Sequence, residues 1–268
     1  MAARMTTTER QLDTADLTER VKGMYQEVAL HPDHDFHFET GRSLAERLGY
    51  PAADLDRIPA AAIDSFAGVG YFLDLAAITP GEVVLDLGSG SGTDAFLAAL
   101  ATGDAGSMIG IDMTAEQLTK ATDLAADAGI ANAEFRQGQI EDPPVEPASV
   151  DCVISNGVVN LSPDKPAVFA AAAAALRPGG RLAIADIVSA RQLPEGVTCD
   201  ASLWAACIGG AMRRDLYLET IEAAGFEIAE VRENDQYRFI SDRADSATQK
   251  YGVTSISLLA RRREEGSP

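Results

Sequence analysis

The chain has 268 residues, a formal net charge of −19 at pH 7 and 46% hydrophobic residues. This length suits one large α/β domain with a smaller added part, and the composition excludes an intrinsically disordered chain. No apolar run approaches the roughly 18 residues that a membrane-spanning helix needs, and so acidic a surface repels nucleic acid and anionic membranes. The first residues lack the apolar segment of a secretory signal, so a cytoplasmic location is expected.

An all-helical segment is predicted at the start of the chain, from apolar residues at helical spacing. The expected helices cover 15–29, 43–48, 58–66 and 71–75. We assign residues 1–78 to an N-terminal helical cap. Gly68 and Gly70 are predicted to be flexible joints that let this cap close over a bound ligand.

From Gly81 onward strands and helices alternate, which is typical of an α/β fold with a doubly wound, mostly parallel sheet. The five expected strands are 81–88, 107–113, 133–137, 149–156 and 181–188, and the expected helices are 93–101, 114–129 and an Ala-rich stretch up to Leu176. The segments 225–234 and 253–262 follow without an assigned type. Thr114 and Gln117 fit a capping box. These elements form a second domain, 79–268, with a helical insertion about 190–224.

The strongest chemical signal is Leu85-Asp86-Leu87-Gly88-Ser89-Gly90-Ser91-Gly92, between the first strand and the first helix of this domain. Its glycines let a ligand lie against backbone N–H groups at a helix N-terminus. Thr93 stands where the dinucleotide fingerprint needs Gly or Ala. Asp86 can hold an ammonium group, and Asp112 ends the second strand where a carboxylate accepts hydrogen bonds from a ribose diol. The pattern predicts a site for a nucleoside joined to an amino acid.

Residues 138–142 follow the third strand, where a backbone N–H and a carboxylate can read the edge of an adenine ring. Together with the glycine loop and Asp112, they indicate S-adenosylmethionine rather than NAD or ATP. The alternative is a glycine turn that only connects strand and helix, beside an acidic residue that only caps.

At this point the chain resembles the class I S-adenosylmethionine-dependent methyltransferases, and more narrowly the arsenite methyltransferases. The resemblance runs from about Ser65 to Gly225 and is carried by VVLDLGSGSGTD (83–94), MIGIDMTAEQL (108–118), FRQGQIED (135–142), VDCVISNGVVNLSPDK (150–165) and LRPGGRLAIADIV (176–188). It implies a Rossmann-like fold, methyl transfer, and S-adenosylmethionine as cofactor. It also implies that Met113 packs on adenine and that Ile140 and Glu141 read its edge. The expected cofactor-binding residues are Asp86, Gly88, Ser89, Gly90, Asp112, Met113, Gln117, Ile140, Glu141 and Asn156.

The acceptor side departs from this resemblance. Arsenite methyltransferases bind trivalent arsenic through three cysteine thiolates, and at the matching positions this chain has Val69, Gly157 and Cys207. One thiolate cannot chelate arsenic as three do, because soft metals need several soft ligands. We therefore expect a small-molecule acceptor, such as a thiol, selenol or metalloid, that contacts Val69, Tyr71, Gly157 and Cys207. Methylation of an oxygen, nitrogen or carbon of an organic metabolite, or cofactor binding without turnover, are the alternatives.

His31, His34 and His37 lie within seven residues of one another. Because a hydroxyl acceptor needs a general base, the catalytic assignment goes to His37, together with Cys207. A solvated loop and a metal site are the other interpretations of this cluster, and no metal site is assigned. The three cysteines, Cys152, Cys199 and Cys207, fit neither a zinc site nor a disulfide framework. The sequence leaves the oligomeric state open.

Overall fold

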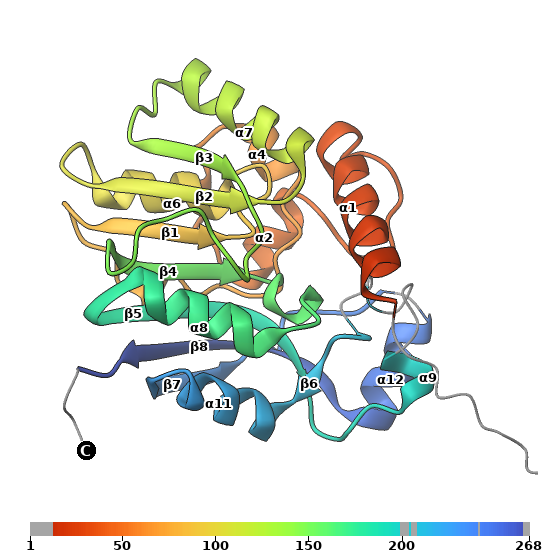
Figure 1. The fold of residues 1–268 in the computed structure, drawn as a ribbon. Helices are drawn as coiled ribbons and strands as arrows, with labels where there is room; N and C mark the ends of the chain where they lie inside the picture. Colours follow the sequence, from red (N-terminus) through yellow and green to blue (C-terminus); the bar gives the residue numbers. More distant parts are fainter. Residues whose placement is uncertain (1–12, 199–203, 205–207, 241, 265–268) are drawn as a thin grey trace, which may run out of the picture.

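The computed structural model describes residues 13–198, 204, 208–240 and 242–264. An eight-stranded sheet has the order β3-β2-β1-β4-β5-β8-β7, with β6 beside β5 (Figure 1). The strands are β1 (Val83–Leu87), β2 (Ser107–Asp112), β3 (Ala133–Gln137), β4 (Val150–Asn156), β5 (Leu176–Ser189), β6 (Met212–Arg213), β7 (Phe226–Glu233) and β8 (Val253–Arg262). Strand β8 pairs antiparallel with β5 and β7, and all other pairs are parallel. The predicted doubly wound, mostly parallel sheet is confirmed.

Helices cover both faces of this sheet. The helices are α1 (Thr14–Leu30), α2 (Arg42–Leu48), α3 (Ala52–Leu55), α4 (Ala60–Asp64), α5 (Leu73–Ala76), α6 (Thr93–Thr102), α7 (Ala115–Ala128), the 3-10 turn η1 (Val159–Leu161), α8 (Lys165–Ala175), α9 (Glu195–Thr198), α11 (Arg214–Ala223) and α12 (Asp242–Tyr251). Helices α8 and α11 lie in front of the sheet in Figure 1, and α6 lies behind it. Side chains alternate across the strands, so Val84 belongs to the core under α6 and Leu85 to the core under α8.

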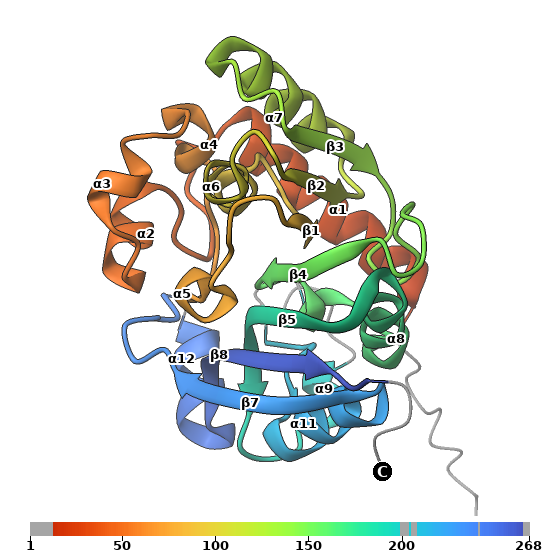
Figure 2. The ribbon, with the colours of Figure 1, turned by 90° about the vertical axis from the view of Figure 1, so that its left-hand side faces the viewer.

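The N-terminal helices share their core with the sheet domain. Leu17 and Val21 of α1 belong to the same buried cluster as Val84, and Leu44 of α2 packs in one cluster with Phe96 of α6. Figure 2 shows α2, α3 and α4 grouped beside α6. In Figure 1, α1 lies beyond the carboxyl ends of the parallel strands. The division of the chain at residue 78 stays a prediction.

Several element boundaries differ from the expected ones, and two of these differences have a clear cause. The helix expected over 58–66 is shorter, because Pro59 precedes α4 and Ser65 ends it. Strand β5 begins at Leu176, since this residue already pairs with Val150 of β4. In the expected insertion about 190–224, the described part contains α9, Trp204 within a helix, β6 and α11.

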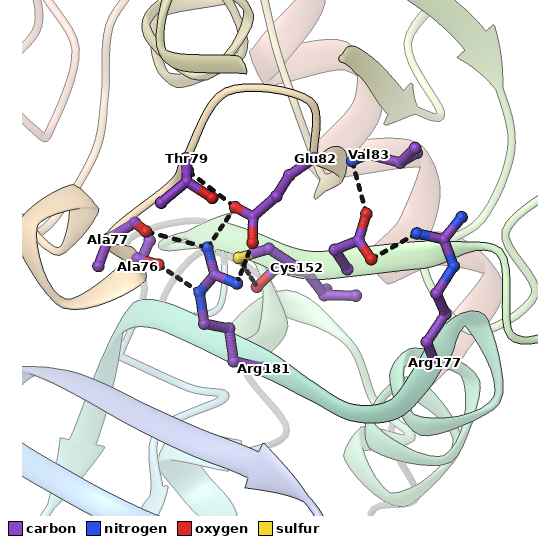
Figure 3. A network of polar contacts seen from close by, with 10 residues as sticks. Ala76, Ala77, Thr79, Glu82, Val83, Cys152, Arg177 and Arg181 are labelled. Carbon is purple, nitrogen blue, oxygen red and sulfur yellow. Dashed lines mark hydrogen bonds and ion pairs between the residues drawn. The ribbon is translucent and has the colours of Figure 1, made fainter. Parts of the chain in front are cut away.

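A partly buried ion pair lies at the amino end of the sheet (Figure 3). Arg181 of β5 donates to Glu82 at 2.8 and 2.6 Å, and the two side chains are 12% and 20% exposed. Arg181 also donates to the carbonyl groups of Ala76 and Ala77, so it joins the end of α5 to β5. Nearby, burial raises the pKa of Cys152 to about 12, so this thiol stays protonated near neutral pH.

Replacing Arg181 with methionine is expected to lower the free energy of unfolding by about 3 kcal/mol, because Glu82 would keep a partly buried charge without its partner. Urea denaturation followed by circular dichroism measures the change. The control is Arg177→Met, which removes an ion pair with Asp151 from a side chain that is 46% exposed. That substitution is expected to cost about 0–1 kcal/mol. Equal effects of the two would contradict the importance of the Arg181 network.

Candidate functional site

A cavity of about 140 Å³ opens at the carboxyl ends of β1, β2 and β4. The strand order reverses between β1 and β4, which is where open α/β sheets bind their ligands. Four of the described lining residues are acidic, namely Asp86, Asp94, Asp112 and Glu141, and none of those described is Lys, Arg or His. An acidic lining favours a ligand that carries positive charge.

The structure brings all ten predicted cofactor-binding residues to this one cavity. They are Asp86, Gly88, Ser89, Gly90, Asp112, Met113, Gln117, Ile140, Glu141 and Asn156. They come from β1, β2, β4, α7 and the loops that follow β1, β2 and β3. Parallel strands present their carboxyl ends at one edge of the sheet, and this brings together residues that are far apart in the chain.

The glycine loop after β1 turns through backbone conformations that favour glycine. Gly88, Gly90 and Gly92 have φ angles of 81°, 53° and 98°, and such positive values are costly for side chains with a Cβ atom. The N–H of Gly90 donates to Asp112 Oδ2 at 3.0 Å, and the N–H of Thr114 donates to Asp112 Oδ1 at 2.8 Å. Each carboxylate oxygen can accept a second hydrogen bond. Asp112 therefore supports the loop and keeps acceptor capacity for a ligand.

Buried polar atoms of Asp86, Ser89 and Thr114 at the cavity have no protein partner. Asp86 is 2% exposed and its Oδ2 accepts no hydrogen bond, and the Oγ of Ser89 is also buried and unpartnered. Burial, together with the nearby carboxylates of Asp94 and Asp112, raises the pKa of Asp86 well above its usual range. A buried polar atom without a partner costs about 1–3 kcal/mol. An ammonium group bound at Asp86 would remove this cost, so the residues fit S-adenosylmethionine.

A buried network that the sequence analysis missed adjoins these residues. The hydroxyl of Tyr50 donates to Asp94 Oδ1 at 2.6 Å, and Asn156 Nδ2 donates to Asp94 Oδ2 at 3.0 Å. Burial raises the pKa of Asp94 to about 6, although these two hydrogen bonds oppose the shift. Asp94 could have been suspected, because it follows the glycine loop in the first turn of a helix. Nothing in the sequence marks Tyr50, which is 44 residues away.

Helix α1 forms one wall of the cavity and is bound to α7. Its lining residues are Leu17, Thr18, Val21 and Tyr25. Gln117 of α7 accepts a hydrogen bond from Ser91 of the glycine loop and donates to the carbonyl of Tyr25 at 2.8 Å. Lys120 donates to the carbonyl of Ala29 at 3.0 Å. The expected capping box is wrong, since Thr114 makes no side-chain cap at α7 and the side chain of Gln117 binds these two neighbours instead.

Of the predicted acceptor residues, Val69, Tyr71 and Gly157 do not line the cavity. Val69 is 1% exposed, and a Cβ atom on Gly157 would lie 3.1 Å from Val69 Cγ1, so these two positions are adjacent. Neither residue lines the cavity, which Phe66, Ala67 and Gly68 border instead. Tyr71 lines a separate groove beside α6. Cys207 and Cys199 lie outside the described residues.

The structure gives a different reason for the two glycines that were expected to be flexible joints. A Cβ atom on Gly68 would lie 2.5 Å from Asn156 Nδ2, and one on Gly70 would lie 2.1 Å from Asn234 Nδ2. These glycines permit close packing.

Hydrogen bonds to three side chains hold the segment 69–71, which contains Gly70. Asn156 Oδ1 accepts from the N–H of Val69 at 2.8 Å, and Ser255 and Ser257 of β8 donate to the carbonyl groups of Val69 and Tyr71 at 2.7 and 3.0 Å.

The histidines do not reach the cavity. His37 contacts Phe38, which stacks on Tyr25, and of these three only Tyr25 lines the cavity. The Nε2 of His37 is buried without a partner. His31 and His34 stack at 4.7 Å. Within the described ranges, no group of three or more His, Cys, Asp or Glu is arranged to hold a metal ion, and no helix there is long and apolar enough to cross a membrane.

Comparison with known proteins agrees with this geometry. Residues 78–233, more than half of the chain, match the family described as methyltransferase domain. The chain is 43% identical over 226 residues to the arsenite methyltransferase of Halobacterium salinarum, covering 84% of this chain and 57% of that protein. It is also 43% identical over 150 residues to the arsenite methyltransferase of Aquipseudomonas alcaligenes, covering 53% of this chain and 43% of that protein. The chain thus spans about half the length of these curated relatives.

Among solved structures, the chain is similar to an arsenic (III) S-adenosylmethionine methyltransferase from Chlamydomonas reinhardtii. The TM-score is 0.68 and the identity 30%, over 86% of this chain and 76% of that one.

Proposed function

The chain belongs to the class I S-adenosylmethionine-dependent methyltransferases, of the arsenite methyltransferase type, and on this basis we propose that it transfers a methyl group to a small-molecule acceptor. The observation that carries the proposal is the acidic cavity with the unpartnered Asp86 and Ser89 at the carboxyl ends of β1, β2 and β4. S-adenosylmethionine, when bound, supplies a methyl group on a positively charged sulfur. The chain supplies binding, alignment and exclusion of water.

We assign the cofactor contacts by chemistry. Asp86 holds the ammonium group of the cofactor, and Asp112 accepts hydrogen bonds from its ribose. Met113 and Ile140 pack on the adenine ring, while Glu141 reads the edge of that ring. The acidic lining and the absence of basic groups among the described lining residues support this assignment, because the cofactor carries positive charge.

The acceptor that we propose is a small soft nucleophile, such as a thiol, a selenol or a metalloid. Three-thiolate binding of arsenic is not available with Val69 and Gly157 at two of the matching positions. A thiol is partly ionised near neutral pH and needs little help from a base. This fits a cavity whose described lining contains no histidine that could serve as a general base.

A screen with methyl-labelled S-adenosylmethionine tests the proposed function. The acceptors are sulfide, small thiols, a selenol, arsenite and phenols, and labelled product is separated and counted. Transfer to one of the soft acceptors is the expected result. Transfer only to phenols would favour methylation of an organic metabolite instead. Cofactor binding without any labelled product over the whole panel would favour a binding protein without turnover.

Cofactor affinity is expected to fall as the pH is lowered through about 6. Burial raises the pKa of Asp86 and brings that of Asp94 to about 6, and a protonated carboxyl no longer attracts the cofactor's positive charge. Lower pH therefore weakens binding, and binding near pH 6 releases protons. Asp86→Asn should flatten this dependence and weaken binding about tenfold near pH 8. Calorimetry in buffers of different ionisation enthalpy measures both effects, with the exposed Asp104→Asn as control.

Restoring the two missing thiols is expected to raise the affinity for trivalent arsenic. The double variant Val69→Cys with Gly157→Cys places two sulfur atoms side by side, since a Cβ atom on Gly157 would lie 3.1 Å from Val69 Cγ1. The positive φ of 73° at position 157 makes cysteine there strained by about 1–2 kcal/mol. Arsenite binding is measured by quenching of the protein's fluorescence, or by the amount of arsenic that stays with the protein after gel filtration. If the double variant binds arsenite no better than the parent, the matching of these positions is wrong.

A further inference from the structure

Lys165 occupies a position that is unfavourable for a lysine. It is the first residue of α8 and only 4% of it is exposed. An ammonium group at a helix N-terminus meets the positive end of the helix dipole, and burial lowers the pKa of Lys165 to about 8. None of the roles proposed above uses this side chain. A buried charge is costly unless it is paired and hydrogen-bonded.

The ammonium group of Lys165 binds backbone carbonyl groups of the turn that precedes α8. It donates to the carbonyl oxygen of Asn160 at 3.0 Å and to that of Ser162 at 2.9 Å. It also stands 5.2 Å from the centre of the Trp204 ring, a cation–π arrangement. The acidic groups Asp186 of β5 and Glu141 of the loop after β3 act on it electrostatically. The hydroxyl of Tyr217 of α11 donates to Asp186 at 2.6 Å.

The same turn forms a wall of the cofactor cavity. Leu161, Ser162 and Pro163 line the cavity, and Lys165 does not. The hydroxyl of Ser162 donates to Glu141, which also lines the cavity. The turn carries a cost of its own, because both side-chain polar atoms of Asn160 are buried without a partner. The conformation of the turn therefore leaves these polar atoms unsatisfied. Lys165 stabilises the turn by donating to two of its carbonyl groups.

We propose that Lys165 is a positioning residue that holds the turn 161–163 against the bound cofactor. Through the carbonyl groups of Asn160 and Ser162 it fixes the cavity wall, and through Ser162 it fixes the carboxylate of Glu141 beside the adenine. This inference rests on the proposed function, since it names a residue that adjusts the same site. Its effect is on cofactor affinity and on the alignment for transfer.

The test compares Lys165→Met with Lys250→Met. Methionine keeps the length of the side chain but removes the charge and the hydrogen bonds. Lys250 is a matched control, because its ammonium also stands over an aromatic ring, 5.1 Å from the centre of Tyr251, while its residue is exposed and lines no part of the cavity. Calorimetry measures the dissociation constant of S-adenosylhomocysteine, the demethylated cofactor, without any acceptor. We expect Lys165→Met to raise it at least about tenfold and Lys250→Met to leave it unchanged.

Measuring the affinity for S-adenosylhomocysteine against pH, in the parent protein and in the variants, separates a positioning role of Lys165 from a merely structural one. Affinity for S-adenosylhomocysteine is expected to decrease in the parent protein above about pH 8, where Lys165 loses its proton. The amino group of the ligand titrates in the same range in every variant, so the difference between parent and Lys165→Met reports on Lys165. Burial raises the pKa of Asp186 to about 6, which is still below this range. Lys165→Arg, which restores a charged donor, is expected to recover part of the affinity.

An unchanged dissociation constant in folded Lys165→Met would overturn the inference, as would identical pH profiles of parent and variant. If Lys165→Met does not fold, the comparison of the parent with Lys165→Arg decides, because arginine keeps its charge above pH 8, and an equally steep loss of affinity in both proteins would contradict the inference. Failure of the proposed function is a separate result. It would appear as absence of labelled product from the parent protein in the acceptor screen, whatever the binding of S-adenosylhomocysteine to the variants.

Discussion

Replacing Asp112 with alanine is expected to weaken the binding of S-adenosylmethionine by at least about tenfold, because each hydrogen bond to a charged acceptor contributes about 1.5–3 kcal/mol. The structure adds a second cause of loss. The carboxylate of Asp112 accepts hydrogen bonds from the N–H groups of Gly90 and Thr114. Alanine therefore removes the ribose acceptor and also loosens the glycine loop. Isothermal calorimetry on the purified variant measures the change in the dissociation constant.

The control for Asp112 is Asp127→Ala, which removes an exposed carboxylate from the far end of α7. It is expected to leave the dissociation constant unchanged. Asp112→Asn separates the two causes, since an amide oxygen can still accept from Thr114 but the amide nitrogen cannot accept from Gly90. Unchanged affinity in a folded Asp112→Ala variant would remove this residue from the cofactor site.

Deleting residues 1–38 is expected to reduce methyl transfer by about a hundredfold, because loss of alignment and entry of water at a reacting centre have effects of this size. The deletion removes α1, whose residues Leu17, Thr18, Val21 and Tyr25 line the cavity. The contacts of Asp86, Asp112 and the glycine loop remain. Cofactor binding should therefore weaken by no more than about tenfold. Initial rates with labelled cofactor and calorimetry on the same sample measure the two effects.

A point variant guards against loss of folding in the deletion. Lys120→Met keeps α1 in the chain but removes the hydrogen bonds to Ala29 and Ser65. It is expected to lower the transfer rate less than the deletion does, while leaving the circular dichroism spectrum unchanged. A deletion variant with full turnover on the true acceptor would show that α1 does not close the site.

The predictable part of this molecule depends on local sequence signals. The run VVLDLGSGSG and the carboxylate of Asp112 lie at strand ends, and the rule that parallel strands converge at their carboxyl ends is enough to bring them together. The ten predicted cofactor residues meet at one cavity for this reason. His37 does not line this cavity, because it lies on a loop after α1 and no strand end directs it there.

The unpredicted part depends on contacts between distant segments. Tyr50 reaches Asp94, and Lys120 reaches the end of α1, through packing that no short motif records. Gln117 matched a capping box in sequence, but tertiary contacts with Ser91 and Tyr25 determine its orientation. The expected joints at Gly68 and Gly70 show the same limit, since a glycine that permits flexibility and one that permits close packing look alike in sequence.

The support of the segment 69–71 by β8 has a consequence for the order in which the chain is synthesised. Ser255 and Ser257 bind backbone groups 186 residues earlier in the chain. The strands that carry the cofactor residues, β1 to β4, occupy only residues 83–156 and are made long before β8 leaves the ribosome. A nascent chain at that stage has the strands that carry the cofactor residues but lacks the serines that bind the segment 69–71. We therefore expect ribosome-bound intermediates to acquire cofactor affinity first and transfer activity only after the last strand has emerged.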